Sequence, residues 1–325
     1  MSAPSQISIF PATSASASRL AEQLQQQHPE IRVRLAARSP SKLQAGGDNV
    51  SISPTPLDIA SVASIKDALE GSQAAYIMNP PFYGEKDPFA LSQTYIDSVI
   101  EAANASSTLK RIVYLSSMGA EQTSGTGPIR NVHIGENALL ANLRDGIEAI
   151  ALRPPYFLSN FSSVLPLAVN PPHILPSMVI PFSKAYAFID ATAIAAKALK
   201  YLLAPPSTSP DAASKGHMTT VQLITEKKTI PQIAELVAEI AGVQVNPVPV
   251  PEEEWFPTFK KAGMSDDQAN LFVDMTKGMV HDRIVYLDEA AIEQEKQRGI
   301  SIISEQTHVD HKAALQHLVN QVKRA

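Results

Sequence analysis

Short apolar segments alternate with amphipathic segments through the first half of the chain, and this alternation is the feature that most constrains the fold. Buried strands are expected at residues 6–10, 31–37, 74–78, 111–116 and 147–152. The segments between them, such as 15–27 and 89–105, place apolar side chains at helical spacing. Strands that alternate with helices form βαβ units, whose strands run parallel beneath helices on both faces. The pattern predicts an α/β fold with a Rossmann-type, doubly wound parallel sheet.

The pattern changes after Pro155, where proline clusters divide the chain into shorter pieces. Helices are expected at residues 192–203 and 231–241, in one or two pieces within 252–277, and in the amphipathic tail 308–322. We therefore predict two parts. Residues 1–155 form a dinucleotide-binding-like domain, and residues 156–325 form a smaller, mostly helical substrate-binding region whose strands partly return to the sheet.

Composition excludes several functional classes. The chain contains no cysteine, which excludes disulfides and thiolate metal sites, and no histidine cluster predicts a metal ion. The net charge is −5 and Lys and Arg are not clustered, which argues against a nucleic-acid partner. The chain shows neither a signal peptide nor an apolar stretch long enough to span a bilayer. We expect a cytoplasmic protein without a membrane partner, and a homodimer stays open.

The loop after the first strand contains no glycine. In dinucleotide-binding folds, glycines here allow a tight turn and close approach to the pyrophosphate. In residues 10–17, Pro11 removes an amide hydrogen, Ser14 disfavours positive φ, and Ala17 adds a methyl group where helix and pyrophosphate would crowd. One interpretation is an ordinary capped turn into the helix. The alternative is a working phosphate loop that uses hydroxyl side chains, among them that of Thr13.

Several segments resemble the NmrA-like branch of the atypical short-chain dehydrogenases. The matching segments are residues 33–39 (Val-Arg-Leu-Ala-Ala-Arg-Ser), 79–81 (Asn-Pro-Pro), 112–117 (Ile-Val-Tyr-Leu-Ser-Ser), 151–157 (Ala-Leu-Arg-Pro-Pro-Tyr-Phe) and 180–182 (Ile-Pro-Phe). Within this branch, the chain is most similar to fungal ergot-alkaloid dehydrogenases of the festuclavine-forming kind. The resemblance covers nearly the whole chain.

This resemblance implies a Rossmann fold, NADP(H), and reduction of small hydrophobic substrates in secondary metabolism. The family's phosphate loop reads Gly-Ala-Thr-Gly-x-x-Gly or close to it. Here Ala12 and Thr13 match, while a proline, a serine and an alanine replace the three glycines. Arg38 stands where the family's 2′-phosphate arginine would be, and a solvated arginine at a strand end is the other interpretation. Asp58 stands where an adenine-contacting acid would be, but we favour it as the N-cap of the following helix.

The Tyr-x-x-x-Lys pair of ordinary short-chain dehydrogenases does not follow the fifth strand. His133 and Glu136 are the local candidates for catalysis, because their i, i+3 spacing would place them on one face of a helix. A histidine titrates near neutral pH and can act as general acid or base. The alternative is a surface helix that carries a histidine and a solvated glutamate.

Side chains that follow the strands should form the substrate pocket, because strand carboxyl ends face the ligand crevice of such sheets. From the first part we predict Pro81, Phe82, Ser116, Met118, Tyr156 and Phe157 as substrate-binding residues, and from the second part Phe182, Trp255, Phe272 and Met275. Phe272 and Met275 belong to a stripe at helical spacing, for which a simple core is the other interpretation. Trp255 follows three glutamates and is expected as a partly exposed anchor.

Three functional hypotheses follow. The first is an enzyme that has kept the reductase fold without a cofactor and catalyses a non-redox step on a small hydrophobic metabolite: isomerisation, cyclisation, dehydration or rearrangement. The second is an NADPH-dependent oxidoreductase of the same family, with Thr13 and Arg38 on the cofactor. The third is a non-enzymatic, dinucleotide-sensing regulator.

Overall fold

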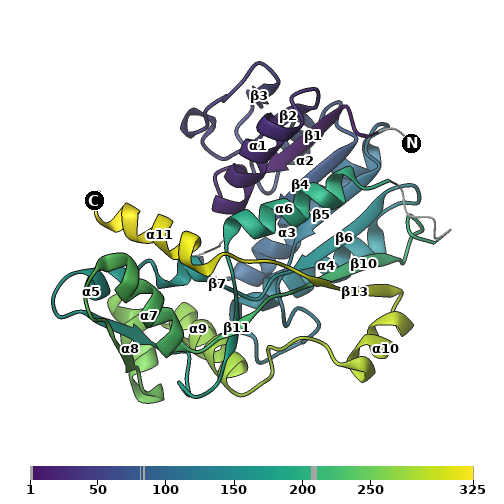
Figure 1. Ribbon diagram of the computed structural model, residues 1–325. Helices are drawn as coiled ribbons and strands as arrows, with labels where there is room; N and C mark the ends of the chain where they lie inside the picture. Colours follow the sequence, from purple (N-terminus) through teal and green to yellow (C-terminus); the bar gives the residue numbers. More distant parts are fainter. Residues whose placement is uncertain (1–2, 81, 83–84, 206–210, 325) are drawn as a thin grey trace.

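A parallel sheet of eight strands forms the centre of the molecule (Figure 1). The computed structural model describes residues 3–80, 82, 85–205 and 211–324. The strands are β3 (Val50–Ile52), β2 (Arg32–Leu35), β1 (Gln6–Phe10), β4 (Ala74–Met78), β5 (Arg111–Leu115), β6 (Glu148–Arg153), β10 (Met218–Ile224) and β13 (Ile300–Gln306), in spatial order. Every neighbouring pair runs parallel. The predicted doubly wound, Rossmann-type fold is confirmed.

Helices cover both faces of this sheet. On one face α1 (Ala15–Gln27) packs against α6 (Ala191–Leu203), and on the other α3 (Pro88–Ala105) packs against α2 (Val62–Leu69) and α4 (Arg130–Asn142). Alternate strand residues supply the two cores. Ile7 and Ile9 of β1 belong to the first core, whereas Phe10 belongs to the second. This alternation follows from the period of two residues in a strand.

A smaller region lies beside the carboxyl ends of the strands (Figure 1). Its helices are α5 (Leu165–Val169), α7 (Ile230–Ala241), α8 (Trp255–Lys261), α9 (Asp266–Val280), α10 (Glu289–Gln297) and α11 (His311–Val322). Its short strands are β7 (Tyr156–Phe157), β8 (Ile174–Ser177), β9 (Tyr186–Ile189), β11 (Lys227–Lys228) and β12 (Asn246–Pro249), and they form two small sheets. The chain of this region also contributes β10 and β13 to the large sheet.

A buried arginine forms hydrogen bonds that link the amino ends of the central strands to α6. The Arg111 guanidinium binds the Glu148 carboxylate at 2.5 Å. It also donates to backbone carbonyls at the end of α6, including those of Tyr201 at 2.9 Å and Ala204 at 2.5 Å. The last carbonyls of a helix have no partner within the helix, so this guanidinium both satisfies them and complements the helix dipole.

Helix α2 begins later than the sequence predicts. Its N-cap is Ser61, whose Oγ accepts a hydrogen bond from the Ser64 amide at 3.3 Å. Asp58 instead accepts from the Ala60 amide at 3.0 Å, in the turn before the helix. The interpretation of Asp58 as the N-cap is therefore wrong, because a serine three residues later takes that role.

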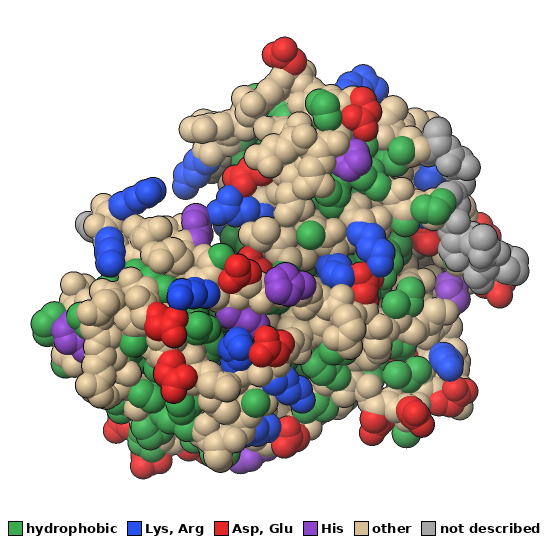
Figure 2. Space-filling view, viewed as in Figure 1, with side chains coloured by type: hydrophobic (Ala, Val, Ile, Leu, Met, Phe, Trp, Pro, Cys, Tyr) green, Lys and Arg blue, Asp and Glu red, His purple; other side chains and the backbone are tan. Residues whose placement is uncertain are grey.

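Helix length and the distribution of surface charge bear on two kinds of partner, a membrane and a polyanion. Across the residues that the structure describes, we find no helix with the length and apolar character needed to cross a membrane. On the face shown in Figure 2, acidic and basic side chains are interspersed without an extended block of one sign.

Candidate functional site

The loop between β1 and α1 makes its turn without glycine. No residue from Pro11 to Ala17 has positive φ, and Ser14 is extended, with φ −77° and ψ 156°. The Ala12 amide donates to the Ala36 carbonyl at 2.8 Å, which ties the loop to the end of β2. Ala17 is 1% exposed and packs in the core. The obstructions expected at Ser14 and Ala17 are therefore absent, although Pro11 still lacks an amide hydrogen.

Two backbone donors at the start of α1 remain unused. The Ser14 hydroxyl accepts from the Ala17 amide at 3.2 Å, which caps the helix. The amides of Ala15 and Ser16 have no partner in the described part of the chain. Thr13 is exposed in the preceding turn. Free amides at the N-terminus of a long helix favour an anion.

Arg38 lies two residues beyond Ala36, to which this loop is tied. Its side chain is exposed and, among the described residues, has neither an ion-pair nor a hydrogen-bond partner. A guanidinium binds phosphate through paired N–H donors. The amides of α1 and Arg38 therefore offer donors suited to a pyrophosphate and to a further phosphate, which fits the chemistry of NADP(H).

A small groove opens at the end of β4. It has a volume of about 190 Å³ and lies between β4, α3, the start of α4 and α9. Phe82 and Phe272 share its apolar wall, as the sequence predicts for a substrate pocket. Pro81, the neighbouring predicted residue, lies outside the described residues.

Three amide side chains, which the sequence analysis missed, add polarity to this groove. Asn79 donates from Nδ2 to the Asn131 carbonyl at 3.0 Å, and Gln268 donates from Nε2 to the Phe82 carbonyl at 3.4 Å. The Oδ1 atoms of Asn79 and Asn131 are buried without a partner among the described residues. An apolar groove with few polar groups is the usual form of a small-molecule site.

A larger groove of about 690 Å³ adjoins the first turn of α1. It lies between α1, α6, α11 and the short 3₁₀ helix η3 (Leu158–Phe161). Its wall includes Ala15, Ser18, Leu158, Ala193, Ala314 and Leu318. The small side chains of three helices leave this space open beside the loop between β1 and α1.

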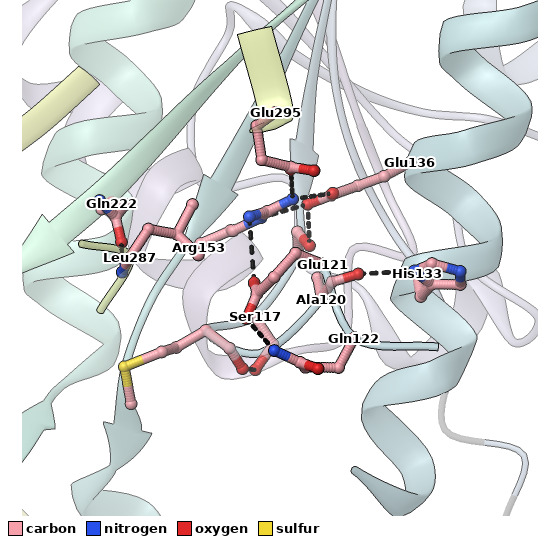
Figure 3. A network of polar contacts seen from close by, with 12 residues as sticks. Ser117, Ala120, Glu121, Gln122, His133, Glu136, Arg153, Gln222, Leu287 and Glu295 are labelled. Carbon is pink, nitrogen blue, oxygen red and sulfur yellow. Dashed lines mark hydrogen bonds and ion pairs between the residues drawn. The ribbon is translucent and has the colours of Figure 1, made fainter. Parts of the chain in front are cut away.

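A buried ion-pair network occupies the ends of β5 and β6 (Figure 3). Arg153 is 2% exposed and meets three carboxylates: Glu136 at 2.6 Å, Glu295 at 2.9 Å and Glu121 at 3.1 Å. Burial lowers the pKa of Arg153, but the carboxylates, led by Glu136, outweigh burial and raise it. Burial raises the pKa of Glu121 more than Arg153 lowers it. The guanidinium is therefore held charged among more carboxylates than it can neutralise.

Glu136 belongs to this network rather than to a catalytic pair. Its side chain is 3% exposed and also accepts a hydrogen bond from the Ser116 hydroxyl. His133, one turn earlier on α4, contacts other groups, and Figure 3 shows the two side chains directed to different partners. The structure therefore contradicts the picture of Glu136 as a solvated or substrate-facing carboxylate.

Both ring nitrogens of His133 are engaged. Nδ1 lies 2.7 Å from the Ala120 carbonyl oxygen, which can only accept, so Nδ1 carries the proton. Nε2 then accepts from Nδ2 of Asn137 at 2.8 Å, while Oδ1 of Asn137 accepts from Arg298 at 2.5 Å. This arrangement suits a neutral imidazole that positions the loop before α4.

Trp255 is a core residue rather than an exposed anchor. It is 0% exposed, and its Nε1 donates to the Val250 carbonyl at 2.8 Å. The expected partial exposure is wrong because the whole side chain, which follows η4 (Glu252–Glu254), is buried and its ring nitrogen has a backbone acceptor there. The other predicted pocket residues Met118, Tyr156, Phe157, Phe182 and Met275 pack partly buried against the core and line neither of the two grooves.

Arg153, the centre of the network, was not among the site residues predicted from the sequence. The available signal was an arginine that ends an otherwise apolar strand, since a buried arginine requires carboxylate partners. Within the described ranges, no three His, Asp or Glu side chains gather closely enough to hold a metal ion.

Comparisons with known proteins agree with this geometry. Residues 12–148 match the sequence model of the NAD(P)H-binding family. No curated protein matches the chain. Among solved structures, the chain is similar to an NADPH-dependent quinone oxidoreductase of Escherichia coli complexed with NADPH, with 20% identity, a TM-score of 0.68, and coverage of 98% of this chain and 99% of that one.

Two further structures share the fold. A nucleoside-diphosphate-sugar epimerase of Staphylococcus aureus has 14% identity and a TM-score of 0.70, covering 96% of this chain and 99% of that one. A mutant of NmrA has 15% identity and a TM-score of 0.61, covering 98% and 90%. The expectation of no cofactor finds no support in the match of residues 12–148 to the NAD(P)H-binding family. Residues 12–148 thus resemble the NAD(P)H-binding family, and the whole chain shares its Rossmann-type fold with these proteins.

Proposed function

We propose that the chain binds NADP(H) along the carboxyl ends of β1 and β2 and reduces a small apolar substrate in the groove at the end of β4. The observation that carries this proposal is the set of unused donors, namely the Ala15 and Ser16 amides and the exposed Arg38. The match to the NAD(P)H-binding family and the NADPH complex of a protein with the same fold support it.

Each of these groups has a separate task in the proposal. The first-turn amides of α1 and the Thr13 hydroxyl would hold the pyrophosphate, and Arg38 would bind the 2′-phosphate that distinguishes NADP(H) from NAD(H). When bound, the cofactor supplies a hydride. The chain's part is to hold the substrate in an apolar groove and to exclude water around it.

The substrate would be a conjugated acceptor, such as a quinone. The imidazole of His133 and the carboxylate of Glu136 are both engaged by neighbouring side chains or carbonyls, so neither is free to protonate a substrate. A conjugated acceptor spreads the charge that arrives with a hydride and can take its proton from water. A groove of about 190 Å³ suits one or two rings, since a cavity of roughly 150 Å³ holds benzene.

Titration with NADPH and NADH tests this function. We expect a Kd near micromolar for NADPH, or about −8 kcal/mol. Arg38→Ala should weaken NADPH at least tenfold and leave NADH nearly unchanged. Arg32→Ala is the matched control, because Arg32 is also exposed but lies at the opposite end of β2. Equal effects of both substitutions, or equal affinity of the wild type for NADPH and NADH, would remove the assigned role of Arg38.

A cofactor-independent enzyme is the second candidate, and Pro11 is the observation that favours it. Pro11 takes one amide donor from a loop that contains no glycine. Such an enzyme would isomerise, cyclise, dehydrate or rearrange a hydrophobic metabolite. NADPH would then bind no tighter than about millimolar, and turnover would need no nucleotide. Under both proposals, the enzyme would act in secondary metabolism, as the resemblance to ergot-alkaloid dehydrogenases implies. Tight NADPH binding without any turnover would identify a sensor instead.

A further inference from the structure

Strand β13 ends the large sheet with an unpaired side. It pairs in parallel with β10 over seven residues, from Ile300 to Gln306, and no other strand in the described part of the chain pairs with it. Figure 1 shows it at the margin opposite β3, which has only three residues. An edge strand presents a row of free backbone N–H and C=O groups that can pair with another chain.

The usual protections of an edge are missing from β13. Its sequence contains no proline and no lysine, and its register with β10 is continuous, without a bulge. Its one charged residue, Glu305, is neutralised within the chain by Lys197 at 2.5 Å and Lys200 at 2.8 Å. At the centre of the strand, Ile303 is 42% exposed. The edge strand is therefore long, regular and partly apolar, and its one charged side chain is already neutralised.

We propose that β13 is the interface of a homodimer, in which it pairs antiparallel with β13 of a second copy about a two-fold axis at Ile303. An edge that pairs with itself around a two-fold axis must be antiparallel. This register places Ile303 opposite Ile303, Ser301 opposite Glu305, and Ile302 opposite Ser304. The pairs are apolar with apolar, hydroxyl with carboxylate, and apolar with a small side chain, and no like charges meet. The strand is thus complementary to itself, and one sheet would run through both copies.

Sedimentation velocity over a concentration series tests the dimer directly. We expect wild-type protein to dimerise and Ile303→Lys, which sets two cations against each other at the axis, to raise the dimer Kd at least tenfold. Leu167→Lys is the matched control, because Leu167 on α5 is also 42% exposed. Its dimer Kd should stay at the wild-type value. A wild type that is monomeric throughout, or equal losses in both variants, would overturn the proposal.

The absence of cysteine from the chain permits a second test that does not weaken the interface. In Ile303→Cys, the two sulfurs would face each other across the axis at a separation that a disulfide can span. Under mild oxidation, this variant should form a disulfide-linked dimer at least tenfold faster than Leu167→Cys at the same concentration. Thermal unfolding of each variant checks that the fold is intact. Equal rates of cross-linking in the two variants would show that β13 does not meet its own copy.

Discussion

The Ser116 hydroxyl donates a hydrogen bond of 2.5 Å to Oε1 of Glu136, and the same carboxylate binds Arg153. The ends of β5 and β6 are thereby joined to α4 and, through Glu295, to α10. Charged groups this deeply buried are expensive to desolvate, and removing one partner is more damaging than replacing the whole set. This asymmetry makes the network open to test.

Arg153→Met should destabilise the fold by about 3–5 kcal/mol, because three carboxylates would remain clustered without their cation. Glu121→Gln should change the free energy of unfolding by less than about 1 kcal/mol, since two carboxylates still neutralise Arg153. Urea unfolding of both variants at neutral pH measures the difference. A large loss in Glu121→Gln would show that all three carboxylates are required.

Glu121 should also make the stability of the fold depend on pH. Burial raises the folded pKa of Glu121 above the unfolded value of 4.5, so the folded state binds its proton more tightly. Stability from this group is complete below pH 4.5 and declines as the pH rises through the folded pKa. As the pH rises through the folded pKa of Glu121, the free energy of unfolding of Glu121→Gln should therefore increase relative to that of wild type. Unfolding measured at a series of pH values follows this difference. A constant difference between the two proteins would exclude the titration of Glu121.

His133→Gln should retain kcat within about tenfold, because both ring nitrogens of His133 are hydrogen-bonded and the side chain positions the Ala120 loop rather than facing a substrate as a free base. Loss of a general base would instead cost about 10²- to 10⁴-fold in kcat and would remove a limb of the pH–rate profile. Steady-state kinetics on a quinone acceptor with NADPH, across pH, separates these outcomes. A large loss with an altered pH profile would restore His133 as the catalytic base.

Gly135 makes room for the ring of Tyr114. A Cβ at position 135 would lie 2.1 Å from the Tyr114 hydroxyl, which is itself buried without a partner in the described chain. Gly135→Ala should therefore destabilise by about 1–3 kcal/mol through overpacking. Tyr114→Phe should be neutral or stabilising, because it removes an unsatisfied buried hydroxyl. The double variant should lose less than the sum of the two, and strict additivity in thermal unfolding would contradict the contact.

The pKa of Glu305 predicts that stability depends on pH in the opposite direction. Burial alone would raise its pKa, but hydrogen bonds from Lys197, Lys200 and Tyr201 outweigh burial and lower the pKa to about 2. Because the folded value lies below the unfolded 4.5, this stabilisation is present above pH 4.5 and is lost as the pH falls towards 2. Acid unfolding of Glu305→Gln should be shallower than that of wild type over this range. Identical acid transitions would remove Glu305 from the explanation.

The sequence predicts the first half of the fold well because its strands are punctuated by local signals. Prolines follow β4 and β6, and Ser14 caps α1, so the ends of these elements are defined by nearby residues. β10 and β13 depend on pairing with strands far along the chain, and no local pattern located them. Trp255 and Glu136 were misplaced for the same reason, since their burial depends on Val250 in one case and on Arg153 in the other.

The hydrogen bonds from Arg111 to the end of α6 have a consequence for fragments of the chain. Arg111 and its partner Glu148 come from the first half, while the α6 carbonyls that accept from Arg111 come from beyond residue 155. The strands β10, which pairs with β6, and β13, which pairs with β10, also come from beyond residue 155. A fragment that stops at 155 would expose the edge of β6, whose six residues are all buried in the whole protein. It would also take from Arg111 the α6 carbonyls that accept its hydrogen bonds and leave it only Glu148. Proteolysis or truncation near this position should therefore yield insoluble pieces rather than an autonomous module, and the two halves should melt together as one cooperative unit.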